Sequence, residues 1–436
     1  MTIAVIGTGF VGVVTAAVYA SFGHKVFGLD IDQKKINKLK KSQVPFHEPQ
    51  LEDLLKETQK KNHLSFTTSY QEAIQSADLI IVAVGTPSTI DGGVDLKYVF
   101  ACAESLAPYL KSEAVVVVKS TVPPGTLDLV RDKIKSRTKT KFNLASLPEF
   151  LREGSAVNDT LHPDRIVIGA ENQTTFELLG ELHAPLKAPI VRVRPESAQM
   201  AKYAANAYLA MRITFINQVA DICEKSGADI EEVISAIGYD KRIGAHYWYP
   251  GPGYGGSCFP KDVKELAHFF KQMGKTDNLF VKINQLNSHR INLLLTDYGR
   301  KVGGFKDKQI LVLGLSFKPN TDDLREAPST KFIPQLIKLR AQIIAFDPVV
   351  KQKTAQAVFG QYLESGSLII EDELDDLTNS ADAIFLLTEW SELISLDYSR
   401  FRNGTKPQWL FDIRNRLNPV QVRKWGFKYQ GIGRQG

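Results

Sequence analysis

The chain opens with a strand-type segment, a glycine-rich turn and a helix-type segment, and this order constrains the fold more than any other feature. The turn, Gly7-Thr8-Gly9-Phe10-Val11-Gly12, has the spacing G-x-G-x-x-G and follows the apolar run Thr2–Ile6. The spacing alone is a weak signal, but a strand before it and a helix after it are the context in which it binds a dinucleotide. Gly7 permits the tight turn, Gly9 lets a pyrophosphate approach the backbone, and Gly12 lets helix and strand pack closely. The segment therefore predicts a βαβ unit whose helix N-terminus holds phosphates.

An acidic residue stands where the second strand of such a unit ends. Asp30 follows the strand-type run Lys25–Leu29, 23 residues after Gly7. A carboxylate there accepts hydrogen bonds from ribose hydroxyls and repels a 2′-phosphate, so we predict NAD rather than NADP as the cofactor. The nearby cation Lys35 counts against that choice. The alternative is a glycine-rich turn that binds no ligand.

Strand-type and helix-type segments alternate in the first part of the chain. The strand-type runs are Thr2–Ile6, Lys25–Leu29, Leu64–Thr67, Leu79–Val84, Ala114–Lys119, Phe142–Ser146 and Arg165–Ile168. Helical patterns lie between several of them, beginning with Val13–Phe22. This alternation predicts a mostly parallel, doubly wound sheet.

The pattern changes at Pro195. Three helical stretches without strands follow, at residues 196–226, 260–273 and 277–301. Alternation then restarts with the strand-type runs Gln309–Leu313, Ala341–Phe346 and Ala383–Leu387. We predict an α/β fold with two doubly wound Rossmann-like domains joined by a long central helix and a helical region. The predicted domains are residues 1–194, 195–304 and 305–436.

The two predicted α/β domains share a short motif. Ser76-Ala77-Asp78 precedes one buried strand-type run, and Ser380-Ala381-Asp382 precedes another. The match suggests that the second domain is a relative of the first, although chance can supply three residues. A shared strand order would decide between these readings.

Composition narrows the class of protein. The 436 residues include 54 Lys and Arg against 48 Asp and Glu, and this mild excess is spread out rather than gathered into a nucleic-acid-binding run. No apolar run reaches the length of a membrane span. Three widely spaced cysteines argue against a disulfide framework or a metal site. We therefore expect a cytoplasmic protein with no nucleic acid, membrane or metal partner.

The most informative segment surrounds one of these cysteines. Four glycines lie in the six positions of Gly251-Pro252-Gly253-Tyr254-Gly255-Gly256, and Ser257-Cys258-Phe259-Pro260-Lys261-Asp262 follows. Pro260 suits the first turn of a helix, so Cys258 is expected just before a helix N-terminus with Lys261 close by. Both features favour the reactive thiolate. The alternative, a small buried hydrophobe, is the reading we apply to Cys102 and Cys223.

Several polar residues accompany these motifs. Lys202 and Asn206 are spaced i and i+4, so they share one face of the long helix. A solvent-facing lysine is the alternative. Glu149 and Glu153 follow a strand and are otherwise ordinary first-turn acids. Hydroxyl residues follow two further strands in Val84-Gly85-Thr86-Pro87 and Lys119-Ser120-Thr121, where ordinary loop chemistry is the alternative.

Taken together, these motifs resemble the UDP-glucose/GDP-mannose dehydrogenase family, in the order seen in UDP-glucose 6-dehydrogenases. The resemblance spans nearly the whole chain, and Gly-Gly-Ser-Cys-Phe-Pro-Lys-Asp is highly specific for nucleotide-sugar 6-dehydrogenases. The segments that carry it are Gly7–Gly12, Val84–Pro87 with Asp91-Gly92-Gly93, Lys119–Gly125, Pro148-Glu149-Phe150, Lys202–Asn206, Gly253–Asp262 and Phe317-Lys318-Pro319-Asn320-Thr321.

The resemblance implies an activity and an assembly. It implies oxidation of UDP-glucose to UDP-glucuronate with two NAD⁺ and water, through a cysteine thiohemiacetal and thioester. It also implies an N-terminal NAD domain, a central helical dimerisation region, a C-terminal domain that completes the UDP-sugar site, and a homodimer.

The resemblance further implies roles for single residues. Cys258 would be the nucleophile, Lys202 would stabilise the substrate oxyanion, and Glu149 would be the general base in thioester hydrolysis. Asp262 and Thr121 would position water, with Asn206 beside them. The residues implied to bind NAD are Gly7, Gly9, Val11, Gly12, Asp30, Lys35, Thr86, Thr121, Glu153 and Lys261. Those implied to bind the UDP-sugar are Glu149, Lys202, Asn206, Arg242, Tyr249, Gly253, Gly255, Lys318 and Arg414.

The chain departs from the family pattern near Arg414. Many relatives have Asp-Gly-Arg there, whereas this sequence has Asp412-Ile413-Arg414. Three other functions stay open: a GDP-mannose or UDP-N-acetylhexosamine 6-dehydrogenase, a two-electron hydroxyacid dehydrogenase, and a non-catalytic nucleotide-sugar binder. The segment Arg242-Ile243-Gly244 favours the UDP-glucose branch, and the intact Cys258 segment counts against a mere binder.

Overall fold

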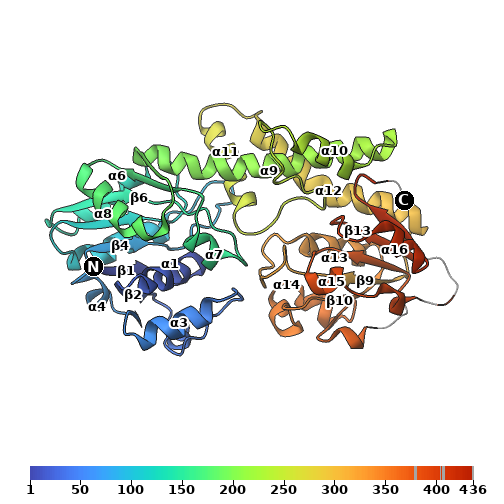
Figure 1. The fold of residues 1–436 in the computed structure, drawn as a ribbon, viewed down its shortest axis with the longest axis horizontal. Helices are drawn as coiled ribbons and strands as arrows, with labels where there is room; N and C mark the ends of the chain where they lie inside the picture. Colours follow the sequence, from blue (N-terminus) through green and yellow to red (C-terminus); the bar gives the residue numbers. More distant parts are fainter. Residues whose placement is uncertain (378–380, 403, 405–407, 435–436) are drawn as a thin grey trace. The chain divides into compact units, whose positions relative to one another are not determined.

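The computed structural model of the protein describes residues 1–377, 381–402, 404 and 408–434. Its chain forms two compact units, Met1–Ala205 and Asn206–Gly436 (Figure 1). Each unit contains one sheet. The long helix α9 (Pro195–Ser226) begins in the first unit and continues into the second.

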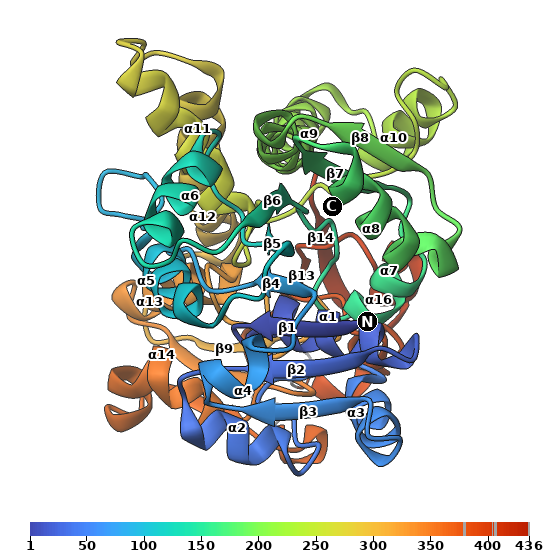
Figure 2. The same cartoon turned by 90° about the vertical axis from the view of Figure 1, so that its left-hand side faces the viewer.

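The first unit contains an eight-stranded sheet in the order β3-β2-β1-β4-β5-β6-β7-β8, whose first six strands follow one another across Figure 2. The strands are β1 (Thr2–Ile6), β2 (Lys25–Leu29), β3 (Leu64–Thr67), β4 (Leu79–Val82), β5 (Ala114–Val118), β6 (Phe142–Ser146), β7 (Ile166–Ala170) and β8 (Ile190–Val193). All neighbours pair in parallel except β6 and β7. The order of the first six strands is that of a dinucleotide-binding sheet.

Helices cover both faces of this sheet. They are α1 (Phe10–Ser21), α2 (Gln33–Leu39), α3 (Leu51–Lys60), α4 (Tyr70–Ile74), α5 (Lys97–Leu106), α6 (Thr126–Lys135), α7 (Ala156–Leu161) and α8 (Gln173–His183). Strand β5 shows why both faces need cover, because all five of its residues are buried. Val115 and Val117 join the core that contains α1, whereas Val116 and Val118 join the core that contains α5. Successive side chains of a strand point to opposite faces, so a buried parallel strand is apolar throughout.

The second unit contains a six-stranded parallel sheet in the order β11-β10-β9-β12-β13-β14. Its strands are β9 (Gln309–Leu313), β10 (Gln342–Phe346), β11 (Leu368–Glu371), β12 (Ala383–Leu386), β13 (Gln408–Asp412) and β14 (Phe427–Gly431). Its helices, besides the part of α9 it contains, are α10 (Ile230–Gly238), α11 (Phe259–Gln272), α12 (Leu279–Val302), α13 (Pro328–Lys338), α14 (Gln352–Glu364), α15 (Ser391–Ile394) and α16 (Pro419–Lys424). The predicted fold class is confirmed: two Rossmann-like sheets with a long central helix in the chain between them.

The six-stranded sheet has the same strand order as the first six strands of the eight-stranded sheet, and the two sheets also share one local hydrogen-bond pattern. The Asp78 N–H donates to the carbonyl of Thr2 at 2.9 Å, and the Asp78 carboxylate accepts from the Thr2 N–H. Asp382 makes the same reciprocal pair with Gln309, at 2.8 and 2.9 Å. Asp78 thus links the start of β4 to the start of β1, and Asp382 links the start of β12 to the start of β9. This shared pattern supports the relationship between the two domains that the sequence motif suggested. Ser380, the first residue of the second motif, lies outside the described residues.

Some element boundaries differ from the predictions. Helix α1 begins at Phe10 rather than Val13, because the last residues of the glycine motif already form its first turn. Strand β7 runs antiparallel to β6 in the otherwise parallel first sheet. Helix α10 was not predicted, since its nine residues follow the long helix after a short break. None of the described helices is both long and apolar enough to cross a membrane.

Candidate active site

The glycine turn after β1 leaves room for a phosphate group. Gly7 has φ +93°, and a Cβ there would lie 2.6 Å from the Ala83 carbonyl oxygen. A Cβ on Gly12 would lie 1.8 Å from the Gly7 oxygen. Gly9 differs, because no described atom comes within 4 Å of its Cβ position, and no described side chain caps α1 there. The open space above Gly9 and the uncapped amides of α1 fit a dinucleotide pyrophosphate.

Asp30 ends β2 beside this turn. Its Oδ2 accepts from the Thr8 N–H at 2.9 Å and from Lys35 Nζ at 2.9 Å, and its Oδ1 accepts from the Asp32 N–H at 3.0 Å. Burial opposes ionisation, but the hydrogen bonds from Lys35, Asp32 and Thr8 outweigh it and lower the pKa of Asp30. Lys35 is therefore held by the carboxylate. The cation that counted against NAD is neutralised in the structure, so this end of β2 fits an NAD ribose.

Two more loops reach the same edge of the sheet. Thr86 follows β4 and Thr121 follows β5, and both are half-buried. Strands β1, β4 and β5 are parallel neighbours, so their carboxyl ends lie side by side. The Ser120 hydroxyl donates to the Val84 carbonyl at 2.7 Å and links these two loops. The structure thus brings Thr86 and Thr121 to the sheet edge where the Gly7 turn lies.

A buried charge cluster lies in the same unit. Lys202 Nζ donates to Glu149 Oε1 at 3.0 Å, and the residues are only 3% and 8% exposed. The second Glu149 oxygen accepts from the Leu151 N–H at 2.8 Å. Lys119, the first residue after β5, is 9% exposed. Burial, and then the charge of Lys202, lower the pKa of Lys119 to about 8, while Glu149 acts in the opposite direction.

Sequence reasoning assigned Glu149 and Lys202 but gave no role to Lys119. The available signal was the position of this lysine directly after the apolar strand Ala114–Val118, at the carboxyl edge of a parallel sheet where ligands bind. Lys202 itself is buried, so the alternative interpretation of a solvent-facing lysine is wrong.

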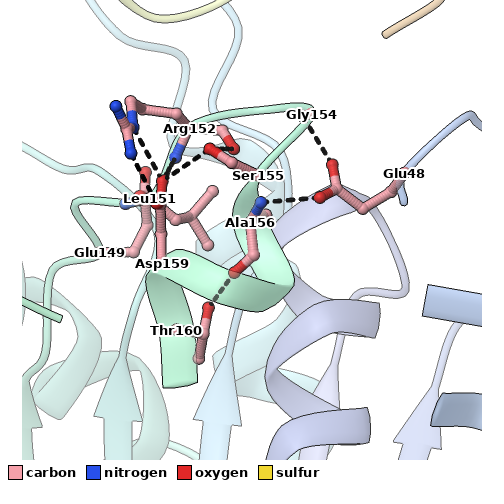
Figure 3. Close-up of polar contacts among 9 residues, drawn as sticks. All are labelled: Glu48, Glu149, Leu151, Arg152, Gly154, Ser155, Ala156, Asp159 and Thr160. Atoms are coloured by element: carbon pink, nitrogen blue, oxygen red, sulfur yellow. Dashed lines mark hydrogen bonds and ion pairs between the residues drawn. The ribbon is translucent and has the colours of Figure 1, made fainter. Parts of the chain in front are cut away.

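The loop from Pro148 to Ser155, which carries Glu149 and Glu153, is held from outside by Glu48 (Figure 3). Glu48 Oε2 accepts from the Gly154 N–H and Oε1 from the Ala156 N–H, each at 2.7 Å. Sequence reasoning missed Glu48. Its partners lie more than 100 residues away in the chain, and no local pattern marks such a contact.

Cys258 lies in the second unit, at the residue that precedes α11. It is half-buried, and its Sγ lies 3.5 Å from the Ser257 hydroxyl. Pro260 occupies the first turn of the helix, and the Cys258 carbonyl accepts from the Asp262 N–H at 2.9 Å. The thiol therefore stands at a helix N-terminus, as the sequence predicted. Cys102 and Cys223 are buried, in keeping with their assignment as small core residues.

Asp262 connects the residues around Cys258. It is 1% exposed, and both of its oxygens have a donor. Asn206 Nδ2 donates to Oδ2 at 2.6 Å, and Lys261 Nζ donates to Oδ1 at 2.7 Å. The second unit thus brings Cys258, Lys261, Asp262 and Asn206 together. Because Lys261 is bound to a carboxylate, a good part of its charge is neutralised there.

The glycines before Cys258 are required by packing inside the unit. A Cβ on Gly253, which has φ +99°, would lie 2.3 Å from Asn287 Oδ1. A Cβ on Gly255 would lie 2.2 Å from the Glu326 carbonyl oxygen. Asn287 also accepts from the Tyr254 N–H and donates to the Tyr254 carbonyl, at 2.8 and 3.0 Å. Glycine is therefore needed at these two positions because the backbone packs closely against α12 and the segment before α13.

Three further residues that were predicted to bind the UDP-sugar, Arg242, Tyr249 and Lys318, contact residues close to them in the chain. Arg242 is exposed and its guanidinium binds Asp240 at 2.6 Å. The Tyr249 ring lies 5.5 Å from that of Tyr247, and Lys318 Nζ lies 5.4 Å from its neighbouring Phe317 ring.

Arg414 ties three strand ends together. Its Nε donates to the Leu387 carbonyl after β12 at 2.7 Å, and its Nη2 donates to the Phe317 carbonyl after β9 at 3.1 Å. Glu389 Oε2 lies 3.1 Å from the same Nε. Ile413, which replaces the family's glycine, is fully buried in the core and has no positive φ. The backbone at this position therefore does not require glycine.

The second sheet has a turn like that of the first, but its interior is filled. Gly314 has φ +91°, as Gly7 has +93°. Asp347, which follows β10 as Asp30 follows β2, is fully buried. Its Oδ2 accepts from the Leu315 N–H at 2.7 Å, and the Trp390 indole N–H lies within 3.3 Å of it. This carboxylate is used inside the domain, so it cannot serve a ribose as Asp30 can.

Comparison with known proteins covers nearly the whole chain. Residues 1–187 match the NAD binding domain of the UDP-glucose/GDP-mannose dehydrogenase family, residues 196–289 its central domain, and residues 311–419 its UDP binding domain. The chain is 40% identical to the UDP-glucose 6-dehydrogenase YwqF of Bacillus subtilis, over 100% of this chain and 98% of that protein. It is 39% identical to the UDP-glucose 6-dehydrogenase of Pseudomonas aeruginosa, with the same two coverages.

Solved structures agree with this assignment. A UDP-glucose dehydrogenase from the archaeon Pyrobaculum islandicum has a TM-score of 0.91 and 34% identity, covering 100% of this chain and 98% of that one. A UDP-D-ManNAc dehydrogenase from Pyrococcus horikoshii has a TM-score of 0.85 and 26% identity. With its glycine-rich turn after β1, its Cys258 helix and a match to each of the three family domains, this chain belongs to the UDP-glucose/GDP-mannose dehydrogenase family and is an NAD-dependent dehydrogenase.

Proposed function

We propose that this protein oxidises the C6 primary alcohol of UDP-glucose to the carboxylate of UDP-glucuronate, with two NAD⁺ and one water. The observation that carries the proposal is the position of Cys258 at the N-terminus of α11, beside the buried Asp262 and Asn206. The full-length relatives named UDP-glucose 6-dehydrogenase support the choice of sugar. GDP-mannose or a UDP-N-acetylhexosamine is the alternative substrate.

The reaction needs a covalent anchor because it removes four electrons in two steps. When bound, NAD⁺ would supply the hydride acceptor, one molecule for each of the two oxidations at C6. After the first oxidation, the Cys258 sulfur adds to the aldehyde carbon, a C–S bond forms, and the carbonyl electron pair moves to oxygen. Loss of the second hydride restores the C=O bond as a thioester. Water then adds to that carbon, the C–S bond breaks, and the thiolate leaves with a carboxylate as product; the sequence releases three protons in total.

We propose that the local electrostatic field around Cys258 stabilises the thiolate form of its side chain. The partial positive charge of the α11 N-terminus favours a negative sulfur. Lys261 and Asp262 balance each other at 2.7 Å, so the helix N-terminus supplies the field that this assignment uses.

We propose charge stabilisation and water activation for the polar residues. Lys202 would stabilise the substrate oxyanion, a role worth about 3 kcal/mol for a single donor in a dry site. Glu149 would accept the proton of the hydrolytic water. Asp262 and Thr121 would position that water, and Asn206 would orient Asp262 through their 2.6 Å hydrogen bond.

We propose that NAD is held by the first Rossmann sheet. Gly7, Gly9, Val11 and Gly12 would receive the pyrophosphate, and Asp30 with Lys35 the adenosine ribose. The further proposed NAD contacts are Thr86, Thr121, Glu153 and Lys261. The proposed UDP-sugar contacts are Glu149, Lys202, Asn206, Arg242, Tyr249, Gly253, Gly255, Lys318 and Arg414, of which the arginines would neutralise phosphate charge.

We further propose a homodimer that uses α9. Tyr208, Phe215 and Ile222 recur every seven residues and are 52%, 54% and 65% exposed. Such a stripe of large apolar side chains along a helix suits packing against a second copy. Sedimentation of the wild type and of Phe215→Glu tests it: the dimer should dissociate in the variant, and a monomeric wild type would overturn it.

We also propose that the chain has three domains, at residues 1–194, 195–304 and 305–436. We propose a cytoplasmic location as well, because a catalytic thiol stays reduced there.

Product stoichiometry tests the proposed function. The wild type should form two NADH for each UDP-glucuronate, and Cys258→Ala should form no acid. Acid formation by Cys258→Ala at the wild-type rate would exclude the thioester route. A wild type that oxidises GDP-mannose or a UDP-N-acetylhexosamine but not UDP-glucose would transfer the proposal to that sugar, and one NADH per product would point to a two-electron dehydrogenase.

A further inference from the structure

The loop from Pro148 to Ser155 is short and has few regular hydrogen bonds of its own, yet it carries Glu149. It connects β6 to α7, and its Gly154 has φ +80°. Ser155 is the residue before α7, but within the described part of the chain its hydroxyl makes no capping bond to that helix. The loop therefore depends on groups outside itself to hold its backbone.

Glu48 supplies that support from a different part of the chain. Its two carboxylate oxygens accept from the N–H groups of Gly154 and Ala156, each at 2.7 Å. Ala156 is the first residue of α7, so Glu48 binds one of the backbone N–H groups that the helix itself leaves without a partner. Figure 3 shows the Glu48 side chain reaching the loop from the opposite side to Arg152. The two bonds fix the last turn of the loop to a buried carboxylate.

Glu48 is itself firmly placed. It is 7% exposed and lies in the segment between α2 and α3. Leu51 and Leu55 of α3 are fully buried in the core that contains α1. Two residues earlier, the Phe46 ring lies 5.1 Å from that of Phe10, the first residue of α1. The segment that carries Glu48 is thus packed against α1, the helix that begins in the glycine turn. The Glu48 carboxylate therefore has a fixed position from which it restrains the loop.

A second tether holds the middle of the loop. The Arg152 N–H and Nε donate to Asp159 Oδ2 at 2.9 and 3.0 Å, and Nη2 donates to Oδ1 at 2.8 Å. Arg152 is exposed, whereas Glu48 is buried. Of the two tethers, the buried one is less accessible to water and therefore the stronger restraint on the backbone.

We propose that Glu48 is a positioning residue for thioester hydrolysis: by clamping Gly154 and Ala156 it sets the backbone that places Glu149 for its role as base. The proposal rests on the proposed function. A displacement of about 1 Å in a reacting group can cost about a hundredfold in rate, so a buried clamp on this loop has a measurable effect. Glu48 needs no contact with substrate for this effect.

Glu48→Gln tests the clamp with little change of shape. The amide keeps one acceptor but presents an N–H₂ to the other backbone N–H, so one of the two bonds is lost. We expect kcat for UDP-glucuronate formation to fall between about tenfold and a hundredfold. The KM for UDP-glucose should fall together with kcat, so that kcat/KM stays within about threefold, because a slower hydrolysis does not affect the steps that form the acyl adduct. Intact-protein mass spectrometry after acid quench should show the acyl adduct on Cys258 building up.

Asn172→Ala is the matched control. Asn172 caps α8 by accepting from the Thr175 N–H at 2.9 Å, in the same unit. It contacts Asn143 at the start of β6, the opposite end of that strand from the Glu149 loop. The control should lose thermal stability as Glu48→Gln does, but keep wild-type kcat and show no adduct.

The outcomes separate the two proposals. A wild type that makes no UDP-glucuronate would overturn the proposed function. A wild type that does so, with Glu48→Gln at wild-type kcat and without adduct, would overturn the role of Glu48 alone. A loss of kcat that the control shares would also overturn it. If Glu48→Gln does not fold, hydrogen exchange on the wild type decides: the Gly154 and Ala156 amides should be protected from exchange, and fast exchange would exclude the clamp.

Discussion

Lys202 Nζ lies 3.0 Å from Glu149 Oε1, and both side chains are almost completely buried. A cation and a carboxylate that are removed from water together neutralise each other, and neither is tolerated there alone. The proposed oxyanion stabiliser and the proposed base therefore depend on each other for their charge state and position. Their coupling is open to direct measurement.

Removing one partner should cost more than removing both. Lys202→Met leaves the Glu149 charge buried without its partner, and we expect a loss of about 3–5 kcal/mol in the free energy of unfolding. Lys202→Met with Glu149→Leu should recover part of that loss, because both charges of this ion pair are then gone. Urea denaturation at pH 7 measures both variants. Equal stability of the single and double variants would show that the two residues are not coupled.

Lys119 should make the protein less stable near neutral pH than at high pH. Burial lowers the pKa of Lys119 to about 8 from 10.5, so the unfolded state binds the proton first as pH falls. Stability is therefore lost as pH falls from 10.5 to 8, and the loss is complete below pH 8. It amounts to about 3 kcal/mol.

Lys119→Met should remove this cost. The variant should unfold at higher urea than the wild type at pH 7, and the difference should shrink as pH rises above 8. Lys133→Met, at an exposed ion pair with Glu104, is the control and should show neither effect. A difference that is constant from pH 7 to 10 would exclude titration of Lys119 as its cause.

His183 should make the first unit sensitive to acid. Its Nε2 lies 2.8 Å from the Tyr19 hydroxyl, and its Nδ1 lies 2.7 Å from the Leu179 carbonyl. Burial lowers the pKa of His183 to about 4, so the unfolded state takes up the proton first as pH falls below 6.5. Between pH 6.5 and 4 the folded state loses about 3 kcal/mol.

His183→Gln separates this group from other causes of acid unfolding. Its side chain can accept from Tyr19 and donate to Leu179 but does not titrate. The wild type should lose stability more steeply than the variant between pH 6.5 and 4, as followed by the thermal midpoint. Parallel curves for the two proteins would assign the acid sensitivity to carboxylates instead.

Asp30 should determine the choice between NAD and NADP. Its carboxylate holds Lys35 at 2.9 Å, so Asp30→Ala removes a negative charge and releases a positive one at the ribose position. We expect kcat/KM for NAD to fall and that for NADP to rise, shifting their ratio by at least about tenfold. Steady-state kinetics with both cofactors measures the shift. Asp30→Ala with Lys35→Ala should lose the gain with NADP, and an unchanged ratio would place the discriminating residue elsewhere.

Short-range features of this protein could be predicted from its sequence. The Gly7–Gly12 turn, the strands β1 and β2, and the start of α11 after Cys258 each depend on residues within one or two turns of chain. Hydrophobic periodicity, glycine and proline positions therefore specify them. The resemblance added roles for residues such as Glu149, but it did not give their contacts.

Contacts between residues far apart in the chain could not be predicted from local patterns. Glu48 contacts Gly154 across 106 positions, and Asn287 contacts the backbone of Tyr254 across 33. The same holds for Lys119, whose strand-end position is visible in the sequence but whose buried surroundings are not. Local sequence sets backbone preference within an element, whereas the partner of a buried charge depends on which strands and helices the topology brings together. Local patterns in the sequence were therefore enough to predict the two Rossmann-like folds and the position of Cys258 before a helix, whereas the contacts of Glu149 with Lys202 and with the Leu151 N–H depend on the folded chain.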